Sequence, residues 1–129
     1  MIPGGGETFR RDRNVILLPH QSDFFHPDLV NGADVVVGKA GYSTIAEVYH
    51  AGVPFGYVPR SNFREMAKLV AFIEKEMKGL CISIEDFQVG KWLRKIFQLL
   101  DLHRTQRNDH NGSYQAAAII TDLLKQEQN

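Results

Sequence analysis

The sequence contains a single cysteine and no surplus of either charge. Cys81 is the only cysteine in 129 residues, so an intrachain disulfide and a cysteine-cluster metal site are both excluded. Its apolar neighbours, Leu80 and Ile82, predict a buried and unreactive thiol. Lys plus Arg and Asp plus Glu number 15 each, which gives a net charge of zero. This balance gives no electrostatic reason to expect a nucleic acid or an anionic membrane as a partner.

Long apolar runs are missing as well. No stretch approaches the roughly 20 apolar residues of a membrane-spanning helix, and the N-terminus does not resemble a signal peptide. We therefore expect a cytoplasmic protein without a membrane span. His20 and His26 are not accompanied by a carboxylate or thiol cluster, so we expect surface histidines and no metal site. A content of 43% apolar and 23% charged residues, in a chain of this length, is typical of one globular domain.

Four short apolar runs, each next to a turn residue, predict buried strands. They lie at residues 15–18, 34–38, 55–58 and 80–84. Residues 1–13 are glycine-rich and then charged, so we expect a linker or loose N-terminal segment there, followed by a domain at 14–129. Helical patterns between the strands predict an α/β fold with one parallel, Rossmann-like sheet that is covered by helices on both faces.

The best-marked helix follows the second strand. Thr44 with Glu47 forms a capping-box pattern at its start. Gly52, followed closely by Pro54, is a typical helix stop. These signals predict a helix between Thr44 and Gly52.

Weaker patterns predict the other helices. Asn62 with Glu65 is a looser start signal before a run of apolar residues at helical spacing. A further helix is expected over about residues 87–100, with Trp92 in or next to the core. Gly112 introduces a last helix with one apolar face, after a polar loop at residues 101–112.

The loop after the second strand is the most informative for function. Residues 38–44 read Gly-Lys-Ala-Gly-Tyr-Ser-Thr and precede the best-marked helix. Backbone N–H groups and the helix dipole converge at such a position, where an anion can bind. The order of residues is neither that of a P-loop nor that of a GxGxxG motif. Taken alone, the pattern is common in α/β domains.

A longer pattern that includes this loop is more specific. Residues 41–47, Gly-Tyr-Ser-Thr-Ile-Ala-Glu, are followed by Gly52-Val53-Pro54. This combination resembles the donor-binding signature of GT-B glycosyltransferases and is similar to that of the peptidoglycan N-acetylglucosamine transferases. Residues 38–65 also resemble the glycosyltransferase-like region of plant arabinokinases. The resemblance implies half of a GT-B fold, which binds a nucleoside diphosphate sugar, in particular a UDP-linked one.

The resemblance implies roles for residues around this loop. Glu47 would accept hydrogen bonds from the ribose hydroxyls, as an ionised carboxylate does well. Gly41, Ser43 and Thr44 would hold the diphosphate at the helix start. Lys39 would lie near the phosphates, where a cation offsets leaving-group charge.

Two other segments receive roles in the same way. The loop at residues 20–24, with Gln21 and Phe24, would hold the base. Asn62, Arg64 and Glu65 lie where relatives place the residues that contact the donor sugar. The Asp-Gln pair of the family is absent there, which sets this chain apart from its relatives.

Each of these residues also has a purely structural interpretation. Glu47 can be the capping-box partner of Thr44, worth about 1 kcal/mol, and Ser43 and Thr44 can be simple caps. Lys39, Arg60 and Arg64 can be ordinary solvent-exposed cations.

The resemblance also indicates what is absent. A GT-B enzyme has two such domains with the chemistry between them, and the acceptor half with its catalytic base has no counterpart here. We therefore expect the donor-binding domain of a glycosyltransferase, truncated at its N-terminus, with no catalytic residue, no metal and no cofactor of its own. The isolated chain should be inactive.

The first strands of the donor half are also expected to be missing, because residues 1–13 are too short and too polar to supply them. A truncated parallel sheet leaves an unpaired apolar edge, which favours a homo-oligomer or the missing acceptor domain as a partner, or coverage of the edge by the N-terminal segment. A non-enzymatic module of the same fold, used for partner binding or regulation, is the alternative function. Another kind of nucleotide-binding α/β protein is a third possibility.

Overall fold

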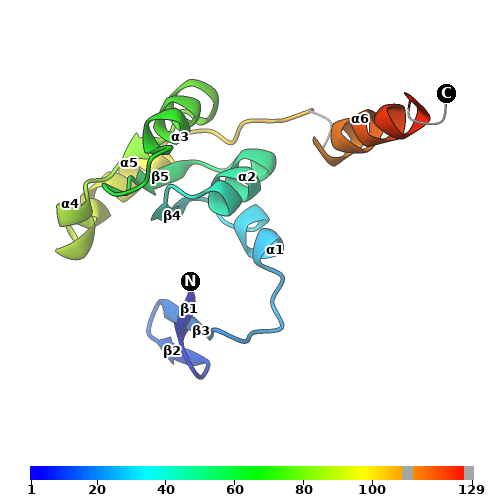
Figure 1. Cartoon of the computed structure of the whole chain (residues 1–129). Helices are drawn as coiled ribbons and strands as arrows, with labels where there is room; N and C mark the ends of the chain where they lie inside the picture. The colour runs from blue at the N-terminus through cyan, green and yellow to red at the C-terminus, as the bar shows by residue number, and fades with distance from the viewer. Residues whose placement is uncertain (109–111, 127–129) are drawn as a thin grey trace.

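The computed structural model describes residues 1–108 and 112–126 and has the expected α/β architecture (Figure 1). Its central sheet has three parallel strands in the order β4 (Val36–Lys39), β5 (Phe55–Val58) and β6 (Leu80–Cys81). The α/β class and the parallel sheet are confirmed. The expected strand at residues 80–84 is shorter, because Ser83 ends it by accepting a hydrogen bond of 3.0 Å from the Asp86 N–H at the start of the next helix.

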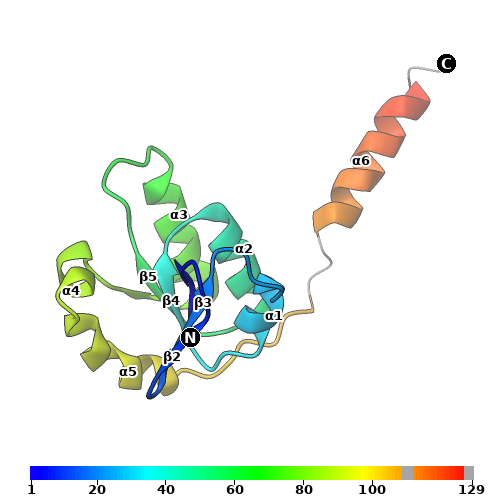
Figure 2. The ribbon, with the colours of Figure 1, turned by 90° about the horizontal axis from the view of Figure 1, so that it is seen from below.

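Helices pack on both faces of β5, as predicted. Phe55 and Tyr57 point into a core formed mainly with α2 (Tyr42–Ala51), α3 (Met66–Phe72) and the π-helical turn Ile73–Met77. Gly56 points to the opposite face, where an added Cβ would lie 2.9 Å from both Ile82 and Leu99 side chains. Figure 2 shows α2 and α3 on one side of the sheet and α4 and α5 on the other.

Tyr57 is the largest fully buried side chain of this core. Its hydroxyl donates a hydrogen bond of 2.9 Å to Glu74 Oε1. Burial, followed by this hydrogen bond to an acceptor, raises the pKa of Tyr57 above its usual range. The phenol therefore stays neutral at physiological pH, and its only polar atom is satisfied within the core.

Residues 1–13 differ from the prediction of a loose segment. They contain β1 (Ile2–Gly6) and β2 (Arg10–Asp12), which flank β3 (Val15–Pro19) in a second sheet of order β1-β3-β2. β1 runs parallel to β3, and β2 pairs with it in an antiparallel hairpin whose turn includes Arg13 at φ 50°. Backbone pairing to β3 therefore outweighs the low strand propensity of the glycines.

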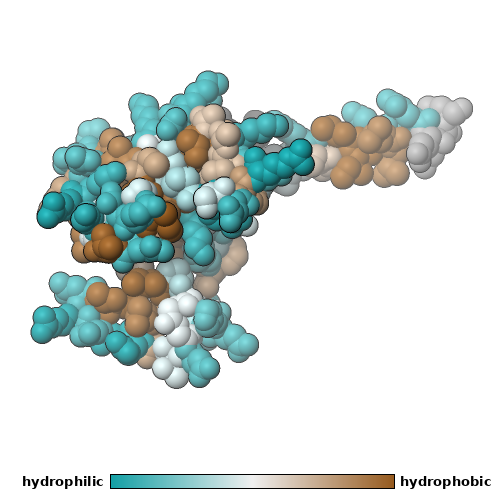
Figure 3. All heavy atoms as spheres, turned by 60° about the vertical axis from the view of Figure 1, so that its left-hand side comes forward, coloured by the Kyte–Doolittle hydropathy of each residue, from teal (hydrophilic) through white to brown (hydrophobic). Residues whose placement is uncertain are grey.

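The strand at residues 15–18 is consequently not part of the central sheet. The prediction of one four-stranded sheet is wrong on this point, because β3 takes its partners from the N-terminal segment. β1 pairs with β3 alone and β4 pairs with β5 alone, so each has a free edge within the described residues. Residues of these two strands, Ile2 and Pro3 on β1 and Val36 to Gly38 on β4, line one cleft of about 650 Å³. Figure 3 shows the two parts of the molecule with hydrophobic residues on the sides that face each other.

Both capping patterns turn out to be wrong. α2 begins at Tyr42 with Gly41 as its N-cap, so Thr44 lies inside the first turn and caps nothing. α3 begins at Met66 with Glu65 at the N-cap position and without a side-chain cap, so Asn62 precedes it by a full turn. In both cases the N-cap lies three residues from the polar residue of the pattern, and no side chain caps the helix.

Gly52 is confirmed as the end of α2. It adopts a left-handed conformation with φ 66°, and its N–H bonds to the Tyr49 and Val48 carbonyls. A Cβ at this position would lie 1.9 Å from the Thr105 carbonyl oxygen. The chain at Thr105 in turn donates its N–H to the Gly52 carbonyl at 2.9 Å, so glycine is required here by both conformation and space.

The chain between β6 and residue 100 is less regular than expected. The single helix predicted over about 87–100 is broken at Gly90, with φ 76°, into α4 (Ile84–Gln88), a 3₁₀ turn at Lys91–Lys95 and α5 (Ile96–Leu100). Trp92 is half-buried and stacks on Phe87 with ring centroids 5.9 Å apart, in line with the prediction. Cys81 is exposed, contrary to the prediction, because β6 is an edge strand whose side chains alternate and Ile82 takes the buried position.

The remaining helices are α1 (His26–Asn31), which packs against α2, and α6 (Gly112–Gln126). The helix predicted after Gly112 is confirmed. α6 extends away from the body in Figure 1, and large apolar side chains on it are exposed: Tyr114, Ile119, Ile120, Leu123 and Leu124. Across residues 1–108 and 112–126, no helix has the length and apolar character needed to cross a membrane.

Candidate functional site

The end of β4 and the start of α2 form an open, uncapped helix terminus. The residue before the helix, Gly41, is extended, with φ −129° and ψ 154°, and an added Cβ would meet no atom within 4 Å. The conformation therefore does not need glycine, but the absence of a side chain leaves the space above the helix start free. α2 has no side-chain cap, so the N–H groups of its first turn point toward this space. Ser43 is exposed and Thr44 half-buried at its edge.

Lys39 ends β4 close to this helix start. Its side chain is exposed, and no ion pair or hydrogen bond to it is found in the described part of the chain. Lys39 stands two residues before Gly41, the N-cap of α2. The structure thus assembles Lys39, Gly41, Ser43 and Thr44 at one end of the sheet, as the sequence predicts.

Glu47 lies one turn further along α2, on the side that faces α1. Its Oε2 atom is 2.5 Å from Nδ1 of His26, the first residue of α1. About 24% of the Glu47 side chain and 46% of the His26 side chain are exposed. Since an ionised carboxylate only accepts hydrogen bonds, the imidazole Nδ1–H is the donor. The interpretation of Glu47 as the capping partner of Thr44 is therefore wrong, because its carboxylate is engaged by another helix.

His26 connects the helix start with the loop that precedes α1. The cleft of about 650 Å³ is lined by His26, Gly38 and Thr44 among others. A second cleft of about 350 Å³ is lined by His20, Ser22 and Phe24, and His26 lies in its wall as well. The structure thus brings Phe24 to a cleft adjoining the one beside Thr44. Gln21 is exposed and lines neither of them.

The loop after β5 approaches α2 through aromatic residues that the sequence analysis did not single out. Phe63 makes an edge-to-face contact with Tyr42, with ring centroids 6.2 Å apart. The Arg60 guanidinium lies 4.4 Å from the centre of the Phe63 ring. Arg60 is thus linked through Phe63 to Tyr42, the first residue of α2. Asn62, Arg64 and Glu65 are all exposed, and the structure does not join them to the other candidate residues.

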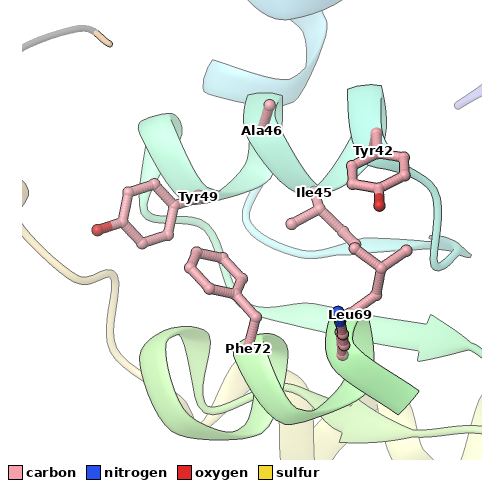
Figure 4. Close-up of a pocket in the computed structure, with 7 residues that line it drawn as sticks. Tyr42, Ile45, Ala46, Tyr49, Leu69 and Phe72 are labelled. Atoms are coloured by element: carbon pink, nitrogen blue, oxygen red, sulfur yellow. The ribbon is translucent and has the colours of Figure 1, made fainter. Parts of the chain in front are cut away.

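A separate apolar groove lies between α2 and α3 (Figure 4). Its volume is about 450 Å³, and it is lined by Tyr42, Ile45, Ala46, Tyr49, Lys68, Leu69 and Phe72. The four lining residues that belong to α2 lie on the side of this helix opposite to Glu47, as the helical spacing requires. Lys68 is the single charged residue of this lining, so the groove does not offer the polar groups that a diphosphate needs.

In residues 1–108 and 112–126, no group of three or more His, Cys, Asp or Glu side chains could hold a metal ion. At the start of α2, the N–H donors and a lysine suit an anion, and the Glu47 carboxylate can accept hydrogen bonds from hydroxyl groups.

Comparison with known proteins gives a family for this arrangement. Residues 12–126 match the glycosyltransferase family 28 C-terminal domain. An L-arabinokinase from Arabidopsis thaliana is 29% identical over 122 residues, which covers 95% of this chain and 12% of that protein. No solved structure matches.

Bacterial enzymes named UDP-N-acetylglucosamine--N-acetylmuramyl-(pentapeptide) pyrophosphoryl-undecaprenol N-acetylglucosamine transferase are also similar. The one from Anaplasma marginale is 32% identical over 122 residues, covering 84% of this chain and 34% of the enzyme. The one from Pseudothermotoga lettingae is 28% identical over 96 residues, covering 73% of this chain and 28% of the enzyme. The chain thus spans about a third or less of the length of these relatives.

Proposed function

Since the chain belongs to the glycosyltransferase family 28 C-terminal domain family, we propose that it binds the nucleotide-sugar donor of a glycosyl transfer reaction. The observation that carries this proposal is the open start of α2 beside the Glu47 carboxylate. An uncapped helix start, the space above Gly41 and the free Lys39 side chain together suit a diphosphate.

Each part of the donor has a place in this proposal. The diphosphate accepts hydrogen bonds from the first-turn N–H groups of α2 and from Ser43 and Thr44, with Lys39 as counter-charge. The ribose hydroxyls donate to Glu47. The base lies against the loop at residues 20–24, where Phe24 offers an exposed ring and Gln21 an amide.

The sugar lies toward the loop after β5. Asn62, Arg64 and Glu65 are its proposed contacts, together with Arg60, which is held beside Tyr42 through Phe63. We propose uridine as the base, because the names of the bacterial relatives specify a UDP-linked donor. A cytoplasmic location stays a prediction.

The proposal is tested by calorimetric titration of the chain with uridine, UMP, UDP and UDP-N-acetylglucosamine. We expect affinity to increase from uridine to UDP, because each phosphate adds charge-assisted hydrogen bonds at the start of α2. The purified chain should bind the donor but transfer no sugar to an acceptor, since it spans so little of its relatives. Affinities that do not depend on the phosphates would contradict the proposed site, and measurable transfer would contradict the binding-only role.

A non-enzymatic module for partner binding or regulation is the second candidate function. It is favoured by the loop after β5, which lacks the Asp-Gln pair of the family and exposes its polar residues without mutual contacts. The same titration distinguishes the two functions, because the module needs no nucleotide.

We also propose that the facing free edges of β1 and β4 promote self-association. Ile2 lines the cleft between them and is 50% exposed. In sedimentation velocity, the parent should form larger species as its concentration rises, and Ile2→Lys should suppress them, because a buried charge at this edge is costly. Val15→Lys is the matched control, since Val15 is 45% exposed on the same sheet but does not line the cleft. A parent that stays monomeric at several hundred micromolar would exclude this form of association.

A further inference from the structure

Glu47, the proposed ribose acceptor, is held by a neighbour from a different helix. His26 Nδ1 and Glu47 Oε2 are 2.5 Å apart, although the two residues are 21 positions apart in the sequence. We propose that His26 is a positioning residue of the donor site. It anchors one carboxylate oxygen of Glu47 so that the other one is presented to the ribose hydroxyls. This inference rests on the proposed donor-binding function.

The geometry favours positioning over simple charge neutralisation. A carboxylate has two oxygens, and the hydrogen bond to His26 occupies only Oε2. No second partner of the Glu47 carboxylate is found among the described residues, so Oε1 keeps its acceptor capacity. A glutamate side chain that is partly exposed would otherwise sample several rotamers, and fixing it before the ligand arrives lowers the entropic cost of binding.

The location of His26 also fits this role. It opens α1, which packs against α2, so the imidazole is placed by the contact between the two helices rather than by a flexible loop. Its side chain lies in the walls of both clefts, between Thr44 on one side and Phe24 on the other. The residue is thus at the junction of the proposed phosphate, ribose and base positions.

The imidazole has a second ring nitrogen, and other groups of the cleft walls lie in its surroundings. Asp28 and Met1 line the larger cleft with it, and His20 lines the smaller one. None of these is joined to His26 by an ion pair or hydrogen bond in the described part of the chain, whereas Glu47 is. The contact to Glu47 is therefore the interaction through which His26 acts.

The test compares ligands that differ only in the ribose. Calorimetric titrations of the full chain with UDP and with 2′,3′-dideoxy-UDP are made on the parent, on His26→Phe and on His26→Asn. Phe keeps a ring of similar size without a donor, whereas the Asn amide nitrogen occupies the place of Nδ1. His50→Ala, an exposed histidine in the last turn of α2, is the control.

We expect His26→Phe to weaken UDP binding about fivefold to tenfold, a fraction of the effect of losing a charge-assisted hydrogen bond outright. Dideoxy-UDP should bind this variant as it binds the parent, because it has no ribose hydroxyls for Glu47. His26→Asn should recover most of the UDP affinity. A purely structural role would lower the affinity for both ligands alike.

The possible outcomes separate the two proposals. If the parent binds UDP and His26→Phe binds it equally well, or if both ligands are weakened to the same extent, the role of His26 is overturned and the donor site stands. If the parent shows no preference for UDP over dideoxy-UDP, the ribose assignment of Glu47 fails and the positioning role fails with it. If the parent binds no nucleotide at all, both proposals fail. Should His26→Phe not fold, His26→Ala replaces it with the same expectations.

Discussion

Replacing Gly52 with alanine is expected to lower the free energy of unfolding by about 3 kcal/mol or more. Gly52 has φ 66°, where a side chain is strained by roughly 1–2 kcal/mol, and its Cβ would lie 1.9 Å from the Thr105 carbonyl oxygen. The backbone at Thr105 would have to move away, and the hydrogen bond of 2.9 Å from its N–H to the Gly52 carbonyl would be lost. Urea unfolding followed by circular dichroism measures the effect.

Gly6→Ala is the matched control for this experiment. Gly6 is also in a region of regular structure, but it does not have a positive φ, and an added Cβ meets no atom within 4 Å. Its replacement should change the free energy of unfolding by less than about 0.5 kcal/mol. Equal stability of Gly52→Ala and the parent would show that the crossing of Thr105 over the end of α2 is not part of the folded state.

The Gly52-Val53-Pro54 part of the motif is therefore structural in this protein. Gly52 ends α2 and admits the crossing chain, and the Pro54 carbonyl accepts the Val36 N–H at 3.0 Å to start the pairing of β4 with β5. Together they fix the direction of α2 relative to the sheet.

Glu47→Gln is expected to reduce the affinity for UDP about tenfold or more, because a hydrogen bond to a charged group is worth roughly 1.5–3 kcal/mol. The amide keeps the shape of the side chain but loses the charge that both the ribose hydroxyls and His26 use. Calorimetric titration gives the loss of affinity. Thermal melts should show a much smaller change, within about 1 kcal/mol, because the contact to His26 is partly exposed.

Glu85→Gln provides the comparison for the same chemical change elsewhere. Glu85 is an exposed residue in the first turn of α4, far from α2 in the sequence and on the other side of the sheet. The Glu85→Gln substitution should leave the affinity for UDP unaltered. If Glu47→Gln binds UDP as tightly as the parent does, Glu47 has a structural role only, in its contact with α1.

Elements encoded by short-range patterns could be predicted from the sequence. The apolar runs of β4 and β5, the glycine stop of α2 and the amphipathic α6 depend on neighbours within a few residues, and all are present. Capping patterns did not predict where α2 and α3 begin. Thr44 and Glu47 have the right spacing for a capping box, but α2 starts at Tyr42 and Glu47 turns toward α1.

Features that depend on pairing between distant segments could not be predicted. The glycines of β1 indicate a loop when taken alone, and only the parallel pairing with β3 makes them a strand. β3 is separate from the central sheet for the same reason, because it pairs with β1 and β2. Cys81 is exposed because of the register of an edge strand, which the apolar neighbours of the residue do not reveal.

The candidate site follows the same rule. Lys39, Gly41, Ser43 and Thr44 are adjacent in the sequence, so their convergence at the start of α2 was predictable. The hydrogen bond between His26 and Glu47 joins two helices, and the contact of Phe63 with Tyr42 joins a loop to a helix. Neither leaves a periodic or local signal in the sequence.

The central claim is that a donor nucleotide binds at the start of α2. Its most direct test is a titration of ¹⁵N-labelled protein with UDP, followed by NMR of the backbone amides. We predict saturable chemical-shift changes that are largest at Gly41, Ser43 and Thr44, with smaller changes in the loop at residues 20–24. No change at these amides at millimolar UDP, or changes confined to the groove between α2 and α3, would contradict the claim.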